Sequence, residues 1–227
     1  MEIREGKFLV IEGPDGSGKT EQFKLLIERL KSEGYPVATF DFPQYEKESS
    51  FFVRQYLNGV YGGWREVGPY KASVFYAVDR FDISPEIRKA KDSGSVVVSN
   101  RYVASNLGHQ GAKLEDAARE EFFRWNSELE FSIFGIPRPD LNIILHMPAE
   151  IAFRLIEKKG AREYLDGKKK DMHEGDIEHL RAAERSYLHI AKMWPEEYTF
   201  VECAENGEPL SIPEIHERVW DVVKRKL

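Results

Sequence analysis

The sequence predicts an α/β domain in which helices flank a five-stranded parallel sheet. Five short runs are rich in strand-forming residues and are apolar almost throughout: Lys7–Glu12, Pro36–Phe42, Ser95–Ser99, Leu141–His146 and Tyr198–Cys203. Such runs are typical of strands that are buried on both faces of a sheet. Segments with helical periodicity lie between them, and this alternation favours parallel strands joined by right-handed crossovers.

The first helix is expected directly after Lys19, and Gly34 is its stop signal. Apolar residues at positions i, i+3, i+4 and i+7 form one helical stripe there: Phe23, Leu26, Ile27 and Leu30. Other helical patterns cover Glu150–Ile156, Glu178–Met193 and Pro213–Val223. The segment from Ala112 to Phe134 is also expected to be helical, and its aromatic residues are candidates for burial against a second subunit: Phe122, Phe123 and Trp125.

A single domain covering residues 1–227 is the predicted organisation. The 227 residues suffice for one substantial core, and no repeat or low-complexity linker divides the chain. One stretch breaks the pattern, because residues 158–174 are polar, basic and poor in apolar side chains. We expect this stretch to be an exposed loop or a mobile lid.

The composition excludes several classes of protein. The formal net charge of −6 gives no basic excess, which argues against sequence-independent binding to nucleic acid. Cys203 is the single cysteine, so no intrachain disulfide can form. No apolar run approaches the roughly 20 residues of a membrane span, and the N-terminus lacks a leader-like pattern. We therefore expect a cytoplasmic protein without a membrane partner.

The segment between the first strand and the first helix carries a phosphate-binding pattern. It matches G-x-x-x-x-G-K-[ST] with the residues Gly13, Pro14, Asp15, Gly16, Ser17, Gly18, Lys19 and Thr20. The glycines let backbone N–H groups converge on a phosphate, Lys19 reaches the β- and γ-phosphates, and the Thr20 hydroxyl can bind Mg²⁺. Its place after a buried strand and before an amphipathic helix predicts a three-layer P-loop NTPase fold that binds ATP.

Asp15 is unusual in this loop, because a carboxylate repels phosphate. One interpretation is a turn residue that hydrogen-bonds its own backbone. The other is an acid that points away from ATP, toward an acceptor hydroxyl or a second metal ion. The sequence leaves both open.

Three further stretches place polar and aromatic residues where a buried core is not expected. Asp41–Tyr45 (DFPQY) and Ser99–Asn106 (SNRYVASN) follow strands, and ligands bind at the carboxyl ends of parallel strands. Tyr76 and Arg80 share one helix face at i and i+4, where a ring can stack on a base and a guanidinium can pair with phosphate. A core aromatic with a solvated arginine is the structural alternative. Arg101 is expected beside the phosphate loop, a setting that suits phosphoryl transfer.

From Phe8 to about Ala191 the chain resembles the thymidylate kinase family. Four motifs carry the resemblance in order: IEGPDGSGKTEQ, FPQY, YAVDR and NRYVASN. The resemblance implies transfer of the ATP γ-phosphate to dTMP, giving dTDP and ADP, with Mg²⁺ and in a homodimer. In-line transfer to a phosphate that is already an anion requires alignment and charge rather than a strong general base.

The resemblance also implies roles for individual residues. Lys19, Asp15 and Arg101 would act at the point of transfer, and Thr20, Asp15 and Glu174 would serve the metal ion. Arg162 and Lys168 would belong to a basic lid over ATP. The acceptor side would comprise Phe42 and Tyr45 as walls, Tyr76 stacked on thymine, Arg80 and Arg101 on phosphate, Asn106 on the base, and His109 and Gln110.

Several positions depart from the family pattern. Asn100 precedes Arg101 where the family usually has Asp, and it brings no charge to a metal ion. His109 stands where an aromatic residue, often Tyr, is usual, and His146 replaces a common acid. The lid is rich in lysine, which lacks the bidentate fork of arginine. A deoxynucleoside kinase of the same fold, with Glu12 or Asp15 as base, and a nucleotide-binding regulator are the alternative functions.

Overall fold

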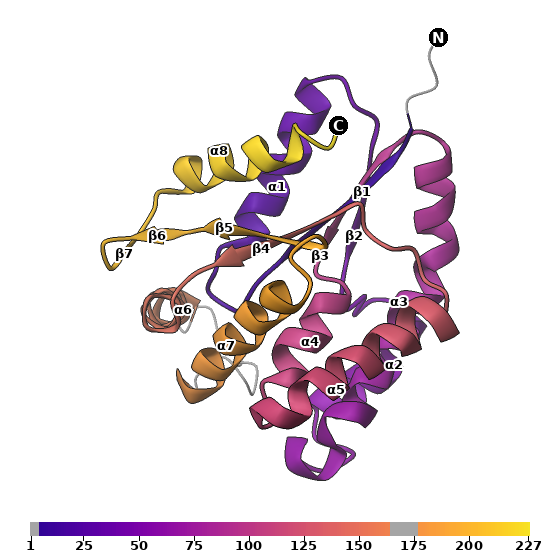
Figure 1. Cartoon of the computed structure of the whole chain (residues 1–227), viewed down its shortest axis with the longest axis vertical. Helices are drawn as coiled ribbons and strands as arrows, with labels where there is room; N and C mark the ends of the chain where they lie inside the picture. Colours follow the sequence, from indigo (N-terminus) through magenta and orange to yellow (C-terminus); the bar gives the residue numbers. More distant parts are fainter. Residues whose placement is uncertain (1–4, 164–176) are drawn as a thin grey trace.

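The computed structural model describes residues 5–163 and 177–227, with only the backbone of residues 159–163 (Figure 1). Within these ranges five strands form one parallel sheet in the order β2-β3-β1-β4-β5. The strands are β1 Lys7–Glu12, β2 Val37–Asp41, β3 Val96–Asn100, β4 Leu141–His146 and β5 Tyr198–Glu202. A short antiparallel pair, β6 Ala204–Glu205 and β7 Glu208–Pro209, follows β5. The predicted α/β fold with a five-stranded parallel sheet is confirmed, and the strand ends differ from the sequence prediction by no more than one residue.

Helices connect the strands as the alternating pattern predicts. They are α1 Lys19–Ser32, α2 Phe51–Leu57, α3 Trp64–Asp92, α4 Val103–Gly111, α5 Asp116–Ser127, α6 Ala149–Glu163, α7 Ile177–Met193 and α8 Ile212–Val223. A 3₁₀ turn, η1 Glu48–Ser50, precedes α2, and a π-helical segment, η2 Glu128–Ile133, extends α5. No helix within the described ranges is both long and apolar enough to cross a membrane.

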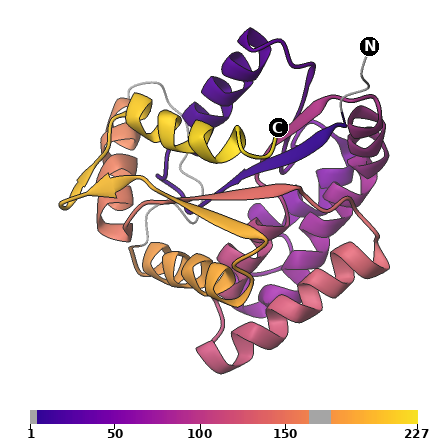
Figure 2. The same ribbon diagram turned by 45° about the horizontal axis from the view of Figure 1, so that its top comes forward.

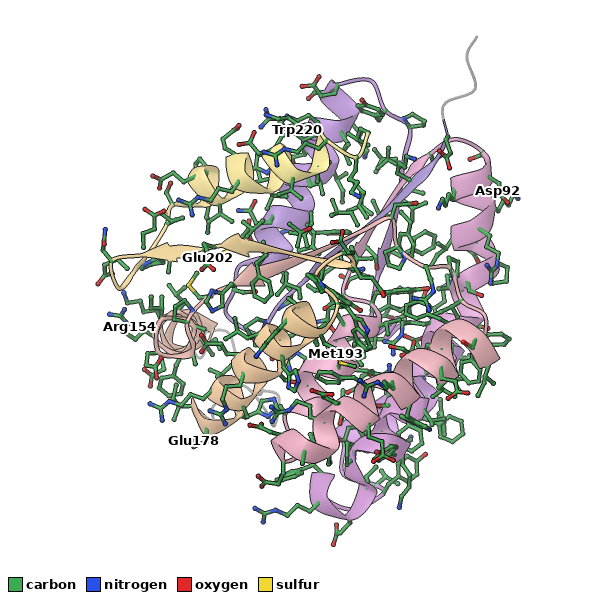
Figure 3. The ribbon with its side chains drawn as sticks, in the orientation of Figure 1. Asp92, Arg154, Glu178, Met193, Glu202 and Trp220 are labelled. Carbon is green, nitrogen blue, oxygen red and sulfur yellow. The ribbon has the colours of Figure 1, made fainter. Side chains whose placement is uncertain are left out.

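Helices cover both faces of the sheet, which makes three layers (Figures 1 and 2). Leu9 and Ile11 of β1 pack in one core with residues of α1 and α8, whereas Phe8 and Val10 face a second core with α3. This division follows from the alternation of side chains along a strand. Figure 3 labels Trp220 on α8, and the Arg29 guanidinium of α1 lies 4.5 Å from the centre of its ring.

Helix α3 is much longer than the sequence pattern indicated. It contains Pro69 and Pro85, and Gly68 has a left-handed φ of 73° that kinks it near its start. Glycine and proline obscured the helical periodicity, because both are breakers in a single-sequence pattern. The kinked helix nevertheless carries Tyr76 and Arg80 toward the same side of the molecule as the ends of β1 and β3.

The prediction for residues 112–134 is partly wrong. The segment contains α5 and then the π-helical η2 rather than one α-helix. Phe122 and Phe123 are fully buried inside this chain, in a core with Leu107 of α4 and Tyr187 of α7. These two rings are therefore not available to a second subunit.

Candidate active site

The loop between β1 and α1 is packed too closely for side chains at two positions. Gly13 has φ 142°, and a Cβ there would lie 2.7 Å from the Leu145 carbonyl oxygen. Gly16 has φ 80°, and a Cβ there would lie 2.7 Å from the Ala152 carbonyl oxygen. The loop thus rests against β4 and α6 and leads into the N-terminus of α1, whose first N–H groups have no partner within the helix. Such a backbone cradle binds phosphate.

Lys19 begins α1 and is buried, with 8% of its side chain exposed. Its Nζ donates a hydrogen bond to the Pro14 carbonyl oxygen at 2.8 Å and lies 3.8 Å from Asp15 Oδ1. Burial, and then repulsion from Arg101, lowers the pKa of Lys19 to about 7, against the opposing effect of Asp15 and Glu12. A bound polyphosphate would supply the negative charge that the free site lacks.

Arg101 follows β3 in a backbone conformation that side chains rarely adopt. Its φ is 65°, which costs roughly 1–2 kcal/mol for a residue with a Cβ. Its backbone N–H donates to the Ile11 carbonyl oxygen at 2.9 Å, which fixes the residue beside the end of β1. The predicted position of Arg101 beside the phosphate loop is confirmed, because β1 and β3 are neighbours and its guanidinium pairs with Asp15.

Asp15 makes the link between the phosphate loop and Arg101. Its carboxylate accepts from Arg101 and lies near Lys19. Burial opposes its ionisation, but the charges of Arg101 and Lys19 outweigh burial and hold the pKa of Asp15 well below its usual range. Of the two interpretations of Asp15, the side-chain contacts favour an acid that faces the acceptor side.

A pocket of about 270 Å³ opens beside Asp15 and Arg101. Every residue predicted for the acceptor side lines it: Phe42, Tyr45, Tyr76, Arg80, Arg101, Asn106, His109 and Gln110. These residues come from the β2–η1 loop, α3, and the end of β3 with α4. The structure thus brings four separate sequence stretches to one cavity, with the phosphate loop at one end.

One of the lining residues, Arg80, belongs to a fully buried ion pair. Arg80 is 2% exposed, and its Nε and NH2 groups donate to the two carboxylate oxygens of Glu130 at 2.6 and 2.8 Å. A third hydrogen bond runs from NH1 to the Tyr102 carbonyl oxygen at 3.3 Å. The charge of Arg80 is therefore already compensated, unlike the charge that a phosphate-binding arginine offers.

Asn106 belongs to the same buried group. Its Nδ2 donates toward three oxygens, which are the Ser73 carbonyl at 3.1 Å, Asn126 Oδ1 at 3.1 Å and Glu130 Oε1 at 3.2 Å. Asn126 in turn donates to Glu130 Oε1 at 3.0 Å. This surrounding of oxygens leaves Oδ1 as the atom of Asn106 that a ligand in the pocket can use.

Comparison with known proteins gives the family. A family model described as thymidylate kinase matches residues 11–210.

The chain belongs to the thymidylate kinase family.

Relatives with that name match most of the chain. A probable thymidylate kinase from Pyrococcus abyssi is 31% identical over 227 residues, covering 98% of both chains. Thymidylate kinase from Mycobacterium tuberculosis is 29% identical over 184 residues, covering 81% of this chain and 85% of the relative. The solved thymidylate kinase of Candida albicans has the same fold, with a TM-score of 0.71 over 97% of this chain and 92% of that one at 19% identity. The resemblance seen in the four motifs is therefore confirmed, as is the prediction of a nucleotide kinase.

His109, which lines the acceptor pocket, contacts Arg101 through its imidazole ring. Its Nε2 lies 3.0 Å from Arg101 NH1, and because arginine only donates, Nε2 accepts and the ring proton is on Nδ1. Burial lowers the pKa of His109 well below its usual value, with Asp15 opposing and Arg101 and His179 reinforcing the shift. The ring of His179 on α7 stacks on it at 5.8 Å. The site thus contains a neutral imidazole.

Sequence reasoning missed several residues in or beside the site, among them Glu130, Lys113 and His179. Glu130 lies in an apolar stretch (LEFSIF), and a lone acid there was the available signal. Lys113 lines the pocket, donating to Gln110 Oε1 at 2.7 Å and Tyr56 Oη at 2.9 Å, and burial lowers its pKa to about 8. No local pattern distinguishes His179, because its ring partner lies on another helix.

The predicted lid falls largely outside the described residues. Lys168 and Glu174 lie there, and only the backbone of Arg162 is described, within α6. Their roles toward ATP and Mg²⁺ stay predictions. Thr20 is exposed at the start of α1, where its hydroxyl is accessible to a metal ion.

The neutral Asn100 has an acidic neighbour. Its Nδ2 donates to Asp41 Oδ1 at 3.0 Å, since the two residues are register partners at the ends of β3 and β2. Asn100 Oδ1 is buried without a hydrogen-bond partner among the described residues. An orphaned amide oxygen on a residue that contacts the Asp41 carboxylate is of the chemical type that a hard cation such as Mg²⁺ binds.

Proposed function

We propose that this chain transfers the γ-phosphate of ATP to dTMP, giving dTDP and ADP. The observation that carries the proposal is the distribution of charged groups around one pocket. One end holds neutralised, fully buried polar groups, and the other holds Arg101 against the phosphate loop. A nucleoside monophosphate has the same polarity, with a neutral base at one end and an anion at the other.

The hydrogen-bonding groups of Arg80 and Asn106 are complementary to the C=O and N–H groups on one edge of thymine. Arg80 offers the N–H groups that Glu130 does not use, and Asn106 offers Oδ1. A donor beside an acceptor pairs with the adjoining C=O and N–H groups of thymine or uracil. Cytosine presents the opposite pattern, so both protein groups would be left unpaired, and buried unpaired polar groups discriminate by factors of roughly 10⁴.

The acceptor phosphate is assigned to Arg101 rather than to Arg80. The guanidinium of Arg80 is committed to Glu130 and lies among neutral amides. Arg101 pairs with Asp15, which is also close to Lys19. A phosphate between Arg101 and Lys19 would therefore meet two cations, and their charge would offset the repulsion between two anionic nucleotides.

ATP and Mg²⁺ fit the phosphate loop. The close packing of Gly13 against Leu145 and of Gly16 against Ala152 fixes the loop as a backbone cradle in which a phosphate would bind. Thr20, Asp15 and the Asn100 oxygen are the described residues that would hold Mg²⁺, with ATP supplying further oxygens. When bound, the ion would neutralise charge on the β- and γ-phosphates.

The contacts of the two candidate bases disfavour a deoxynucleoside kinase. Glu12 is fully buried and accepts from the Tyr102 backbone N–H at 2.6 Å and from Ser105 Oγ at 2.7 Å. Asp15 is paired with Arg101. Neither carboxylate is free to take a proton from a 5′-hydroxyl, whereas an acceptor that is already a phosphate needs no such base.

We also propose a cytoplasmic homodimer. Its contact surface would be an aromatic face on α2 and the loop that follows it, where Phe51, Phe52 and Tyr61 are 47%, 47% and 38% exposed. Phe75 joins them, with ring centres 5.8 Å from Phe52 and 5.5 Å from Tyr61. A contiguous exposed aromatic face is typical of a subunit interface. Light scattering should give twice the chain mass for the native protein and a lower mass for Phe52→Glu.

A coupled assay of ADP release tests the reaction. The panel contains dTMP, dUMP, dCMP, dGMP and thymidine, each with MgATP. We expect the highest kcat/KM for dTMP and little turnover with dCMP or thymidine. Turnover only with nucleosides would contradict the proposal, and so would binding of ATP without turnover of any acceptor.

A further inference from the structure

The buried carboxylate of Glu130 is not needed to contact either nucleotide, yet it holds both residues that face the base. We propose that Glu130 is a positioning residue that sets base specificity by fixing which atoms Arg80 and Asn106 present to the pocket. The identity of the base rests on the proposed function, but the orientation of the two side chains does not.

The grip on Arg80 is bidentate and rigid. Two parallel hydrogen bonds, from Nε to Oε2 and from NH2 to Oε1, hold the plane of the guanidinium. The Tyr102 carbonyl holds a third N–H group. The remaining N–H groups of Arg80, which lines the pocket, then have one direction in which to donate.

The hydrogen bond between Glu130 and Asn106 determines whether the oxygen or the nitrogen of the Asn106 amide faces the pocket. Oε1 of Glu130 accepts from Asn106 Nδ2 at 3.2 Å and from Asn126 Nδ2 at 3.0 Å. Asn126 Oδ1 also accepts from Asn106 Nδ2, which closes a three-residue ring of hydrogen bonds. A flipped Asn106 would place its oxygen against three oxygens, so these contacts disfavour the flipped state.

Stability alone does not account for this arrangement. Both partners are almost fully buried, at 2% and 0% exposure of their side chains. Replacement of a buried ion pair by apolar residues of similar volume is often neutral or stabilising. The acid is also carried on π-helical η2, whose wide winding is marked by the hydrogen bond from Phe134 N to the Leu129 carbonyl at 2.9 Å. Single-turn π-helices occur often at functional sites.

The Glu130→Gln variant keeps the shape of the side chain but removes its charge and changes its hydrogen-bond pattern. Glutamine has the same shape, but one of its two head atoms donates. That donor conflicts with the N–H groups of Arg80 or of the two asparagines, and a coupled flip of Asn106 and Asn126 relieves the conflict with the two amides. Asn106 would then present N–H groups to the pocket, which suits the N3 acceptor of cytosine instead of the N3–H of thymine.

The orientation can be measured without any substrate. In protein labelled with ¹⁵N-asparagine, the Asn106 side-chain NH₂ signal is assigned by its loss in Asn106→Ala. We expect strong protection of this NH₂ group from solvent exchange in the native enzyme and at least tenfold faster exchange in Glu130→Gln. Unchanged protection in Glu130→Gln overturns the inference, whatever the enzyme phosphorylates.

Kinetics then test the effect on specificity. We expect the ratio of kcat/KM for dTMP to that for dCMP to fall at least tenfold in Glu130→Gln, while the KM for ATP is unchanged. Glu128→Gln makes the same chemical change at an exposed position of η2 and should leave the ratio as it is. An equal loss for both acceptors would indicate a merely structural role and overturn the inference.

A more conservative variant covers the case in which Glu130→Gln does not fold. Glu130→Asp keeps the charge but is one methylene shorter, so it cannot hold Arg80 bidentately and reach Asn106 together. We expect the ratio of kcat/KM for dTMP to that for dCMP in Glu130→Asp to be at least threefold below the native ratio. It should remain above the ratio of a site without base specificity. A native ratio in Glu130→Asp overturns the inference. If the native enzyme does not phosphorylate dTMP, the proposed function fails, and the exchange measurement alone decides the role of Glu130.

Discussion

The two ends of the acceptor pocket use charge in opposite ways. At the base end, Arg80 and Glu130 are withdrawn from solvent and neutralise one another through two short hydrogen bonds. At the phosphate end, Asp15 and Arg101 remain about one-fifth exposed, and Asp15 is shared between Arg101 and Lys19. In the proposed reaction the Arg80–Glu130 pair would keep its contacts when the acceptor binds, whereas Asp15, Arg101 and Lys19 would exchange contacts with one another for contacts with phosphate. This proposal assigns specificity to the buried pair and reactivity to the partly exposed group.

The largest expected effect comes from removing the cation at the reactive end. Lys19→Ala should lower kcat by a factor on the order of 10³, because a preorganised charge at the transferring phosphate is lost. Steady-state kinetics with dTMP and MgATP measure it. Lys24→Ala, at an exposed position of the same helix, is the matched control. If Lys19→Ala lost affinity for the acceptor but kept its kcat, the result would contradict the assignment of Lys19 to phosphoryl transfer.

Arg80→Leu tests the rigid end. It leaves the Glu130 carboxylate buried and unpaired, and breaking such a pair lowers the free energy of unfolding by about 3 kcal/mol or more. Denaturant unfolding measures this change, and acceptor KM should rise in parallel. Lys89→Leu replaces an exposed cation of the same helix and should change stability by less than about 0.5 kcal/mol.

The double variant Arg80→Leu/Glu130→Gln sharpens that result. It contains no unpaired charge, so it should recover part of the stability lost in the single variant. A double variant less stable than Arg80→Leu would show that Glu130 is stabilised by groups other than Arg80.

Protonation of Lys19 when MgATP binds tests the phosphate end of the pocket by a measurement that does not involve unfolding. With a pKa of about 7, Lys19 is largely neutral at pH 8 in the free enzyme, and a bound polyphosphate restores its charge. Binding of MgATP at this pH should therefore take up close to one proton. Calorimetry in buffers of different ionisation enthalpy measures the uptake, and Lys19→Ala should abolish most of it.

The same pKa makes the ligand-free protein pH-dependent in a defined direction. The native pKa of Lys19 lies below the ordinary value of 10.5, so the unfolded chain binds more protons between about pH 7 and 10.5. The contribution of Lys19 to the free energy of unfolding therefore rises as pH increases through this window. A contribution that falls with pH would contradict the assigned burial.

The smallest effect is expected at His146, which lies at the same edge of the sheet but outside the pocket. Glu184 at 3.0 Å and Glu202 at 2.6 Å raise its pKa, with burial opposing. Figure 3 labels Glu202 at the end of β5. The contribution is present below the ordinary pKa of 6.5 and is lost as pH rises through the raised value.

His146→Gln should therefore destabilise the protein by about 1 kcal/mol or less at pH 5.5 and by less at pH 8.5. Thermal unfolding at the two pH values measures the difference. An equal effect at both would show that the charge of His146 does not matter.

The sequence predicted the phosphate end of the pocket better than the base end. The phosphate loop was predictable because its eight positions are consecutive and each has a local chemical reason. Most acceptor residues were predictable because three further motifs, FPQY, YAVDR and NRYVASN, follow the phosphate loop in order. The Arg80–Glu130 pair was not, because its members are 50 positions apart and the acid lies in a π-helical segment that no single-sequence pattern marks. Arg80 was accordingly predicted to bind phosphate, and its buried partner is what argues for the base instead.

The wide winding of η2 has an evolutionary consequence. A π-turn is an α-helix with one residue too many, so deleting a single residue between Ser127 and Glu130 would restore ordinary winding and rotate neighbouring side chains by about 100° relative to one another. Such a deletion would swing the acid out of the hydrogen-bond ring in one step. If Glu130 sets base specificity as proposed, the loss of one codon is enough to change acceptor preference, a route that comparison of substitutions alone would overlook.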